Sequence, residues 1–216
     1  MIKFKDFLTE LRKPPEIDIF KNSKEVKNLK AVDSRNEKWR KSLPDLFQHY
    51  GFSQVGEGKF GSVFINEEYP YALKIFMKDT AYLKFLNFVK QNPDNKYLPK
   101  IKGKVLKITP MVMAVRLEKL TPAAGGSKFG NFFKMCLDPE DFLEGYMELD
   151  SISKDDKDAV SICNFLVENK KICDIHRGNI MMRGQTPILI DHLYAWFRNG
   201  SYAIDPDNLT GLEDLF

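Results

Sequence analysis

Residues 171–192 read KICDIHRGNIMMRGQTPILIDH, and this stretch decides how the rest of the chain is interpreted. Its pattern predicts a loop, a short strand, a tight turn at Arg183-Gly184 and a second, apolar strand over residues 187–190. That strand ends on Asp191. A carboxylate at the end of a buried strand needs a partner, because an unpaired buried charge is costly. A magnesium ion bound to phosphate would be such a partner.

Three polar residues on this stretch, Asp174, Asn179 and Asp191, have the spacing of a phosphoryl-transfer site. Protein kinases place an Asp in the catalytic loop, an Asn five residues later, and a second Asp after a hairpin. In this interpretation Asp174 accepts the proton of the substrate hydroxyl, while Asn179 and Asp191 hold the metal. The alternative is a polar turn followed by a capping aspartate. The hairpin and Asp191 together favour phosphoryl transfer.

A second motif lies earlier in the chain, where Gly56, Gly58 and Gly61 form G-x-G-x-x-G. In a dinucleotide-binding fold a helix would follow these glycines. Here residues 63–65 and 71–76 predict two strands joined by a turn. The glycines therefore predict a two-stranded flap whose backbone lies over phosphates, because a Cβ would hold the backbone away.

Lys74 lies in the sequence Ala72-Leu73-Lys74, which has the pattern of the strand that carries the kinase lysine. A lysine inside an apolar strand is usually an outward-facing, solvated residue. Its position thirteen residues after Gly61 favours a functional role instead. That role is to pair with the α- and β-phosphates of ATP. Asp174 and Lys74 are thus the predicted catalytic residues.

The helix predicted next, over residues 79–89, departs from the kinase pattern. It would normally carry a glutamate that pairs with the strand lysine. No Glu occurs between Glu68 and Glu118. The partner of Lys74 is left open between Asp79, Asp191 and no partner before ATP binds.

Residues 104–117 predict a hairpin with a turn at Thr109-Pro110, which completes an antiparallel sheet of five strands over residues 50–120. Residues 118–120 then leave the sheet, where a kinase hinge offers backbone groups to adenine. Residues 121–126 are the most loop-like part of the chain and mark the predicted lobe boundary. The predicted nucleotide contacts are Gly56, Gly58, Gly61, Val63, Ala72, Lys74, Glu118 and Leu120.

The second half predicts helices over residues 139–147 and 153–169, a turn at Asn199-Gly200 and a last helix from Pro206. The core candidates of the second helix are Val160, Cys163, Phe165, Leu166 and Val167.

Composition narrows the function classes. The 216 residues carry a net charge of only +3, which argues against a dedicated nucleic-acid binder. The three cysteines have no C-x-x-C spacing, so neither a disulfide framework nor a zinc site is predicted. There is no apolar run long enough for a membrane span and no secretory segment, so we expect a cytosolic protein.

Three segments are expected. Residues 1–43 form an extension, which is either a loosely packed arm or a contact surface for a protein. Residues 44–120 form a kinase N-lobe with a sheet and one helix. Residues 121–216 form a minimal, helical C-lobe. The expected fold is therefore α+β, two-lobed and protein-kinase-like.

The stretch around Asp174, together with GSYAIDPDNL downstream, resembles the early serine/threonine protein kinases of T7-like bacteriophages. That resemblance implies a kinase that uses ATP and Mg²⁺ in the host cytoplasm. It also implies host proteins as substrates, with RNA polymerase as a candidate, and a contribution to host transcription shut-off. The matching positions are Asp174, His176, Gly178, Asn179, Ile180, Met181, Asp191 and residues 204–206.

The chain also departs from ordinary kinases, because Cys173 replaces the arginine before the catalytic Asp and His192 follows Asp191 where D-F-G is usual. Only about 25 residues follow Asp191, which predicts a minimal kinase without loop-phosphorylation control. Two alternatives stay open. One is a small-molecule phosphotransferase of the aminoglycoside- or choline-kinase type, since its loop shares D-x-H-x-x-N. The other is a catalytically dead binding module.

Overall fold

The computed structural model describes residues 44–45, 47–48, 51–58, 61–108, 112–123, 126–170, 175–191, 197–198, 201–202 and 215. The whole predicted extension, the predicted base Asp174 and most of the predicted last helix lie outside these residues. The chain divides into two compact units, Met1–Lys78 with Val105–Arg116 and Asp79–Lys104 with Leu117–Phe216. The predicted limits of the three segments stay predictions. In the described part of the chain, no helix is long and apolar enough to cross a membrane.

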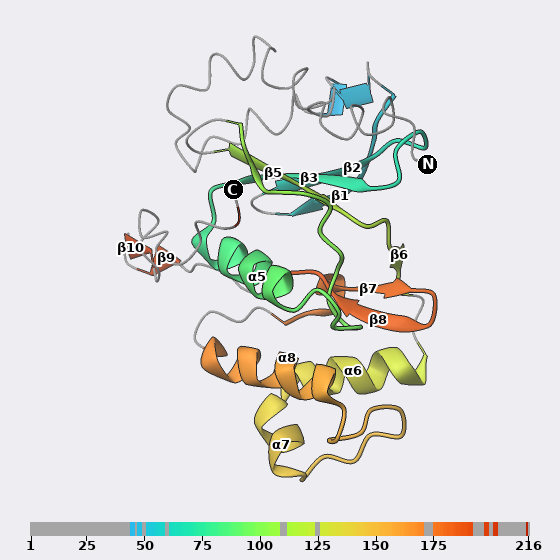
Figure 1. Ribbon diagram of the computed structural model, residues 1–216, viewed down its shortest axis with the longest axis vertical. Helices are drawn as coiled ribbons and strands as arrows, with labels where there is room; N and C mark the ends of the chain where they lie inside the picture. The colour runs from blue at the N-terminus through green and yellow to red at the C-terminus, as the bar shows by residue number, and fades with distance from the viewer. Residues whose placement is uncertain are drawn as a thin grey trace, which may run out of the picture. The chain divides into compact units, whose positions relative to one another are not determined.

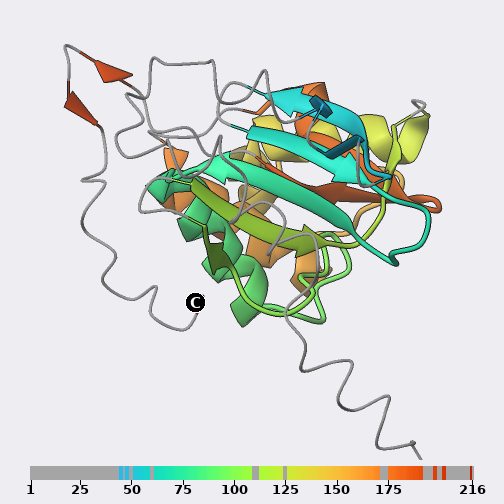
Figure 2. The same cartoon turned by 90° about the horizontal axis from the view of Figure 1, so that it is seen from above.

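An antiparallel sheet of five strands forms the first unit, as the sequence predicts (Figures 1 and 2). Its order is β1-β2-β3-β5-β4, so the 104–117 hairpin adds its second strand next to β3. In that hairpin Leu106 pairs with Ala114 and Lys107 with Met113. The strands are β1 (Ser53–Gly58), β2 (Gly61–Ile65), β3 (Ala72–Met77), β4 (Leu106–Lys107) and β5 (Val112–Leu117).

One face of this sheet carries an aromatic core. Phe47 stacks on Phe64 with ring centroids 4.6 Å apart, and Phe52 meets Phe47 edge-on at 5.6 Å. Side chains alternate between the two faces of a strand. Since Phe64 lies on the core face, its neighbour Val63 belongs to the opposite face. The core cluster is Phe47, Phe52, Phe64, Leu73, Ile75, Met77, Val112 and Ala114.

The second unit begins with α5 (Thr80–Gln91), which confirms the predicted helix and extends it. Asp79 starts the helix, because its Oδ1 accepts hydrogen bonds from the backbone N–H groups of Ala81 at 2.9 Å and Tyr82 at 3.3 Å. This cap supplies partners for two donors that the first turn of a helix leaves open.

Three further helices are α6 (Ser127–Leu137), α7 (Pro139–Glu144) and α8 (Lys157–Glu168). The sequence interpretation did not include α6. It made α7 too long, because Gly145 adopts a left-handed φ of 82° and ends the helix. It also started α8 too early, since Asp156 is the N-cap. Val160 and Val167 were wrongly assigned to the core: both are half-buried, whereas Cys163, Phe165 and Leu166 are buried as predicted.

A three-stranded sheet in order β6-β7-β8 completes this unit, with β6 (Thr121–Pro122), β7 (Ile180–Arg183) and β8 (Thr186–Leu189). The hairpin β7–β8 confirms the prediction, and Gly184 turns it with a φ of 60°. Residues 121–122 were predicted as loop, but they pair with Met182 and Met181 of β7. Pro122 is tolerated there because β6 is an edge strand.

Helices α6 and α8 pack against each other beneath the β7–β8 hairpin (Figure 1). A short antiparallel pair, β9 (Phe197–Arg198) and β10 (Ser201–Tyr202), flanks the predicted turn at residues 199–200.

Candidate functional site

Strand register aligns several predicted nucleotide contacts in the first unit. Gly56 on β1 is opposite Val63 on β2, and Val63 is opposite Lys74 on β3. Directly opposed residues share a face of the sheet, and Ala72 lies two positions from Lys74 on that same face. A register shift between Gln54 and Gly56 brings Gly56 into this row. The structure therefore gathers Gly56, Val63, Ala72 and Lys74 on the face opposite the aromatic core.

The three motif glycines differ in what the protein itself requires. A Cβ on Gly61 would lie 2.6 Å from the carbonyl oxygen of Ile75 and 3.1 Å from the Cα of Phe76, so β3 leaves no room for one. A Cβ on Gly56 would meet nothing closer than 3.7 Å, and one on Gly58 nothing closer than 4.0 Å. Packing thus accounts for Gly61 alone. Glycine inside a strand weakens it and often marks close approach of a ligand.

Lys74 is half-buried between Leu73 and Ile75, which are fully buried on the core face. It is therefore only partly exposed to solvent. One oxygen of Asp79, a suggested partner of Lys74, already accepts the two N–H groups that begin α5. Which residue pairs with Lys74 stays a prediction.

In the second unit the hairpin brings Asn179 and Asp191 to the same end. Ile180 pairs with Leu189, and the N–H of Ile190 donates to the carbonyl oxygen of Asn179 at 2.9 Å. Asp191 is the next residue after Ile190, and both predicted metal ligands are half-buried. Within the described ranges no three His, Cys, Asp or Glu side chains are grouped as a metal site. One carboxylate and one amide still suit Mg²⁺, which takes few protein ligands and keeps phosphates and waters.

The turn before β7, η2 (Arg177–Asn179), explains the H-x-G part of the motif. The Nδ1 of His176 accepts a hydrogen bond from the N–H of Gly178 at 3.1 Å and so caps the turn. A Cβ on Gly178 would lie 2.9 Å from the ring Cε1 of His176. Histidine and glycine are therefore a local structural pair that fixes the chain entering Asn179. Their presence does not discriminate between protein and small-molecule phosphotransferases.

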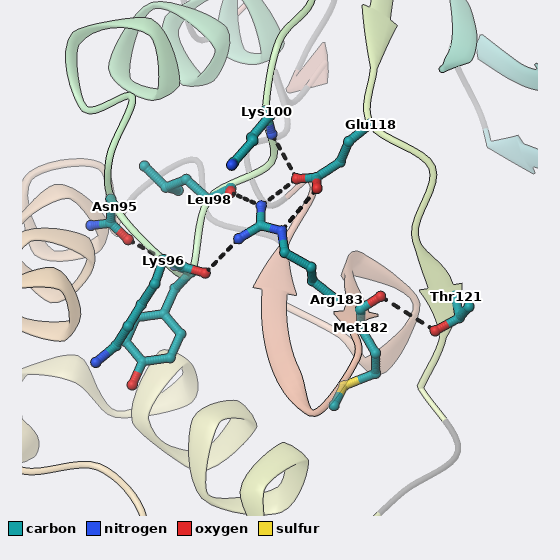
Figure 3. Close-up of polar contacts among 9 residues, drawn as sticks. Asn95, Lys96, Leu98, Lys100, Glu118, Thr121, Met182 and Arg183 are labelled. Carbon is teal, nitrogen blue, oxygen red and sulfur yellow. Dashed lines mark hydrogen bonds and ion pairs between the residues drawn. The ribbon is translucent and has the colours of Figure 1, made fainter. Parts of the chain in front are cut away.

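Glu118, a predicted adenine contact, is held by Arg183 (Figure 3). Arg183 donates from Nε to Oε2 at 2.8 Å and from Nη2 to Oε1. The backbone N–H of Lys100 donates to the same carboxylate at 2.7 Å, and the N–H of Glu118 donates back to the Lys100 carbonyl at 2.9 Å. A hinge contact from Glu118 would therefore use its carbonyl. Leu120, the other predicted adenine contact, is half-buried between β5 and β6.

Two opposing effects act on the pKa of Glu118. Burial alone would raise it, but the hydrogen bonds from Arg183 and Lys100 and their positive charges hold it below its usual value. Arg183 also donates to the carbonyl oxygens of Lys96 at 3.1 Å and Leu98 at 2.9 Å. It thus ties residues 96–100, Glu118 and the β7–β8 hairpin together. The sequence interpretation treated Arg183 only as a turn residue, and no local pattern reveals partners so distant in the chain.

Residues 95–98 also anchor the hairpin to α8. The N–H of Leu189 donates to the carbonyl of Tyr97 at 2.9 Å, and the Tyr97 hydroxyl donates to Asp156 at 2.8 Å. Burial, and then the bond to Asp156, raise the pKa of Tyr97, so the phenol stays neutral. Asn95 donates to the carbonyl of Asp158 at 2.9 Å. The strand that ends at Asp191 is therefore fixed to a hydrogen-bonded framework.

The chain matches no known protein family in a comparison with family models, and no curated protein matches it significantly. The resemblance to phage kinases thus rests on the motif residues alone.

A groove of about 490 Å³ opens between α5 and α8, and its lining residues include none of the predicted site residues. Phe88 and Phe165 are among its lining residues, and their rings stack with centroids 4.0 Å apart. Two lysines and two acidic residues line it, so its charges balance and favour no one ligand class. The lining residues are Phe88, Lys154, Asp155, Lys157, Val160, Ser161, Asn164, Phe165 and Glu168.

Proposed function

We propose that this chain is an ATP-dependent serine/threonine protein kinase with a reduced kinase-like fold. In this proposal the chain is a phage protein that acts in the host cytoplasm early in infection. Its substrates are host proteins, RNA polymerase being a candidate, and it contributes to host transcription shut-off. These biological assignments rest on the motif resemblance.

The observation that carries the proposal is the register of the β7–β8 hairpin. It holds Asn179 and Asp191, twelve residues apart in the sequence, at one end of a pair of strands. The Ile190 to Asn179 backbone bond of 2.9 Å fixes this arrangement. The amide oxygen of Asn179 and the carboxylate of Asp191, at adjacent ends of the two strands, are suitable ligands for magnesium.

The sheet of the first unit supports nucleotide binding. Gly56 and Gly58 have no packing neighbour that excludes a Cβ, so a requirement for glycine there points to a ligand close to the backbone. Lys74 shares the face of Gly56, and its ammonium group would hold phosphate oxygens. Val63 and Ala72 supply apolar surface on the same face.

The residues have distinct roles in this proposal. ATP and Mg²⁺ supply the phosphoryl group and the charge that offsets its oxygens. Asn179 and Asp191 hold the ion. Asp174 orients the substrate hydroxyl and accepts its proton, for which it must come within about 3 Å. Lys74 positions the phosphates.

The test is transfer of label from radioactive ATP to proteins of a host lysate by the full chain. We expect label on Ser and Thr, and its loss in Asp174→Ala. Asp191→Asn and Asn179→Ala should each lower the rate by roughly 100-fold or more, because charge stabilisation at the transferring group is lost. Asp150→Asn is the matched control, since this exposed turn residue lies far along the chain from the site residues. It should keep the wild-type rate.

Three outcomes would contradict the proposal. Wild-type turnover by Asp191→Asn at limiting magnesium would remove the metal assignment. Label on an aminoglycoside or on choline, with none on protein, would favour the small-molecule phosphotransferase. ATP binding without any transfer would favour the binding module.

A further inference from the structure

Arg177 occupies an unusual position in the turn that leads to Asn179. Its guanidinium carbon lies 6.0 Å from the ring centroid of Phe129 and 5.9 Å from that of Phe133. These phenylalanines are one helical turn apart on α6, and their rings are nearly parallel, with an interplanar angle of 4°. Two aromatic rings therefore hold the guanidinium group, an arrangement with a favourable cation–π interaction.

The donor groups of Arg177 are left available by this arrangement. Among the residues that the structure describes, its side chain makes neither a hydrogen bond nor an ion pair, and it is exposed. Arg183, by contrast, donates hydrogen bonds to the carboxylate of Glu118 and to two backbone carbonyls. An arginine held by rings keeps a planar fork of N–H groups that matches a carboxylate, and less side-chain freedom is lost when one binds.

The location of Arg177 limits what it can reach. One residue, Gly178, separates it from Asn179, so the Cα atoms of Arg177 and Asn179 are at most about 7 Å apart. The Arg177 side chain therefore starts from the same turn as the proposed metal ligand. Any protein substrate whose hydroxyl is phosphorylated there presents its neighbouring residues to this surface.

We propose that Arg177 selects protein substrates with an Asp or Glu close to the phosphorylated Ser or Thr. This inference rests on the proposed kinase function and gives it a substrate class. The carboxylate binds the exposed edge of the guanidinium group, while Phe129 and Phe133 fix its orientation. Lysine would not replace it, because an ammonium group lacks the planar fork.

The experiment maps phosphorylated sites in a host lysate treated with the full chain, with Arg177→Gln or with Lys134→Gln. Lys134 is an exposed lysine of α6, the helix that carries Phe129 and Phe133, so its substitution controls for the loss of one positive charge. We expect acidic residues to be enriched around the sites for wild type and Lys134→Gln, and not for Arg177→Gln.

A second measurement uses two synthetic peptides of one mapped site. One peptide keeps the acidic residue, and the other carries Asn or Gln in its place. Wild type should prefer the acidic peptide about threefold to tenfold in kcat/KM, mainly through KM. Arg177→Gln should bring that ratio close to one, and Arg177→Lys should lower it.

The outcomes separate the two proposals. If no protein is phosphorylated by wild type, the kinase function fails and this inference falls with it. If sites are phosphorylated without acidic enrichment, or Arg177→Gln keeps the wild-type ratio, only the inference is overturned. A raised KM for ATP in Arg177→Gln with an unchanged peptide ratio would assign Arg177 to nucleotide phosphates instead.

Discussion

Replacing Arg183 by Met should destabilise the second unit, because it removes four hydrogen bonds at once. Two of them reach the carbonyls of Lys96 and Leu98 at 3.1 and 2.9 Å, and two reach Glu118. The side chains of Arg183 and Glu118 are 30% and 13% exposed. Breaking a fully buried pair costs about 3–5 kcal/mol, and breaking an exposed one costs about 0–1 kcal/mol. For this partly buried site we expect a loss of about 2–3 kcal/mol in the free energy of unfolding.

Urea denaturation measures this loss as a lower midpoint at unchanged slope. A double-mutant cycle with Glu118→Gln isolates the pair, and we expect a coupling of about 1 kcal/mol or more at pH 7. Lys170→Met is the matched control. It removes an ion pair with Glu140 of 2.6 Å whose side chains are 68% and 50% exposed, and it should not move the midpoint measurably.

The coupling should also depend on pH in a defined direction. The folded pKa of Glu118 lies below its unfolded value, which is about 4.3. The unfolded chain therefore binds the proton first. The stabilisation is complete above the unfolded pKa and is lost as the pH falls through the folded pKa. A coupling near zero at pH 7, or one unchanged at strongly acidic pH, would refute the role given to Arg183.

The other predictions concern the site and the core. Asp174→Asn should lower kcat by roughly 100-fold or more with little change in ATP affinity, since its loss falls on the transition state; calorimetry beside protein phosphorylation rates checks both values. Lys74→Ala should instead weaken ATP binding as well as turnover, and unchanged binding would contradict its role. Gly61→Ala should destabilise the fold by about 1–3 kcal/mol, because its Cβ would meet the β3 backbone. Gly56→Ala should leave stability within about 0.5 kcal/mol but weaken ATP binding, and equal denaturation midpoints for the two glycine variants would be the contrary result. Burial raises the pKa of the Cys163 thiol to about 12, so it should react with a thiol reagent only after unfolding, as peptide mapping of labelled protein would reveal.

The local elements of this protein could be read from sequence because short-range signals specify them. Asp79 caps α5 through the backbone of the next residues, and Gly184 turns the β7–β8 hairpin. Strand-like apolar runs bounded by turn residues predicted the five-stranded sheet. Helix α6 gave no such signal, since its N-cap is Gly126 without a side-chain bond, and Gly130 lies inside it.

In the candidate site, too, part of the arrangement was predictable from sequence and part depends on the observed strand register. Spacing alone predicted Asp174, Asn179 and Asp191 as a set, because a hairpin with a tight turn brings its two ends together. The register that aligns Gly56 with Val63 and Lys74 depends on a shift in β1 that no sequence pattern revealed.

Only the tertiary structure decided which groups serve packing and which remain available to a ligand. Gly61 must be glycine because a Cβ there would meet the backbone of β3, whereas a Cβ on Gly56 would meet nothing so close. In the sequence motif the two positions look the same. Arg183 and Arg177 are likewise indistinguishable by sequence. Arg183 donates its hydrogen bonds to partners 65 to 87 residues away in the chain, whereas the guanidinium group of Arg177 packs against two rings of α6. Contacts over such separations depend on how the whole chain closes on itself, and so they are decided by packing and not by neighbouring residues.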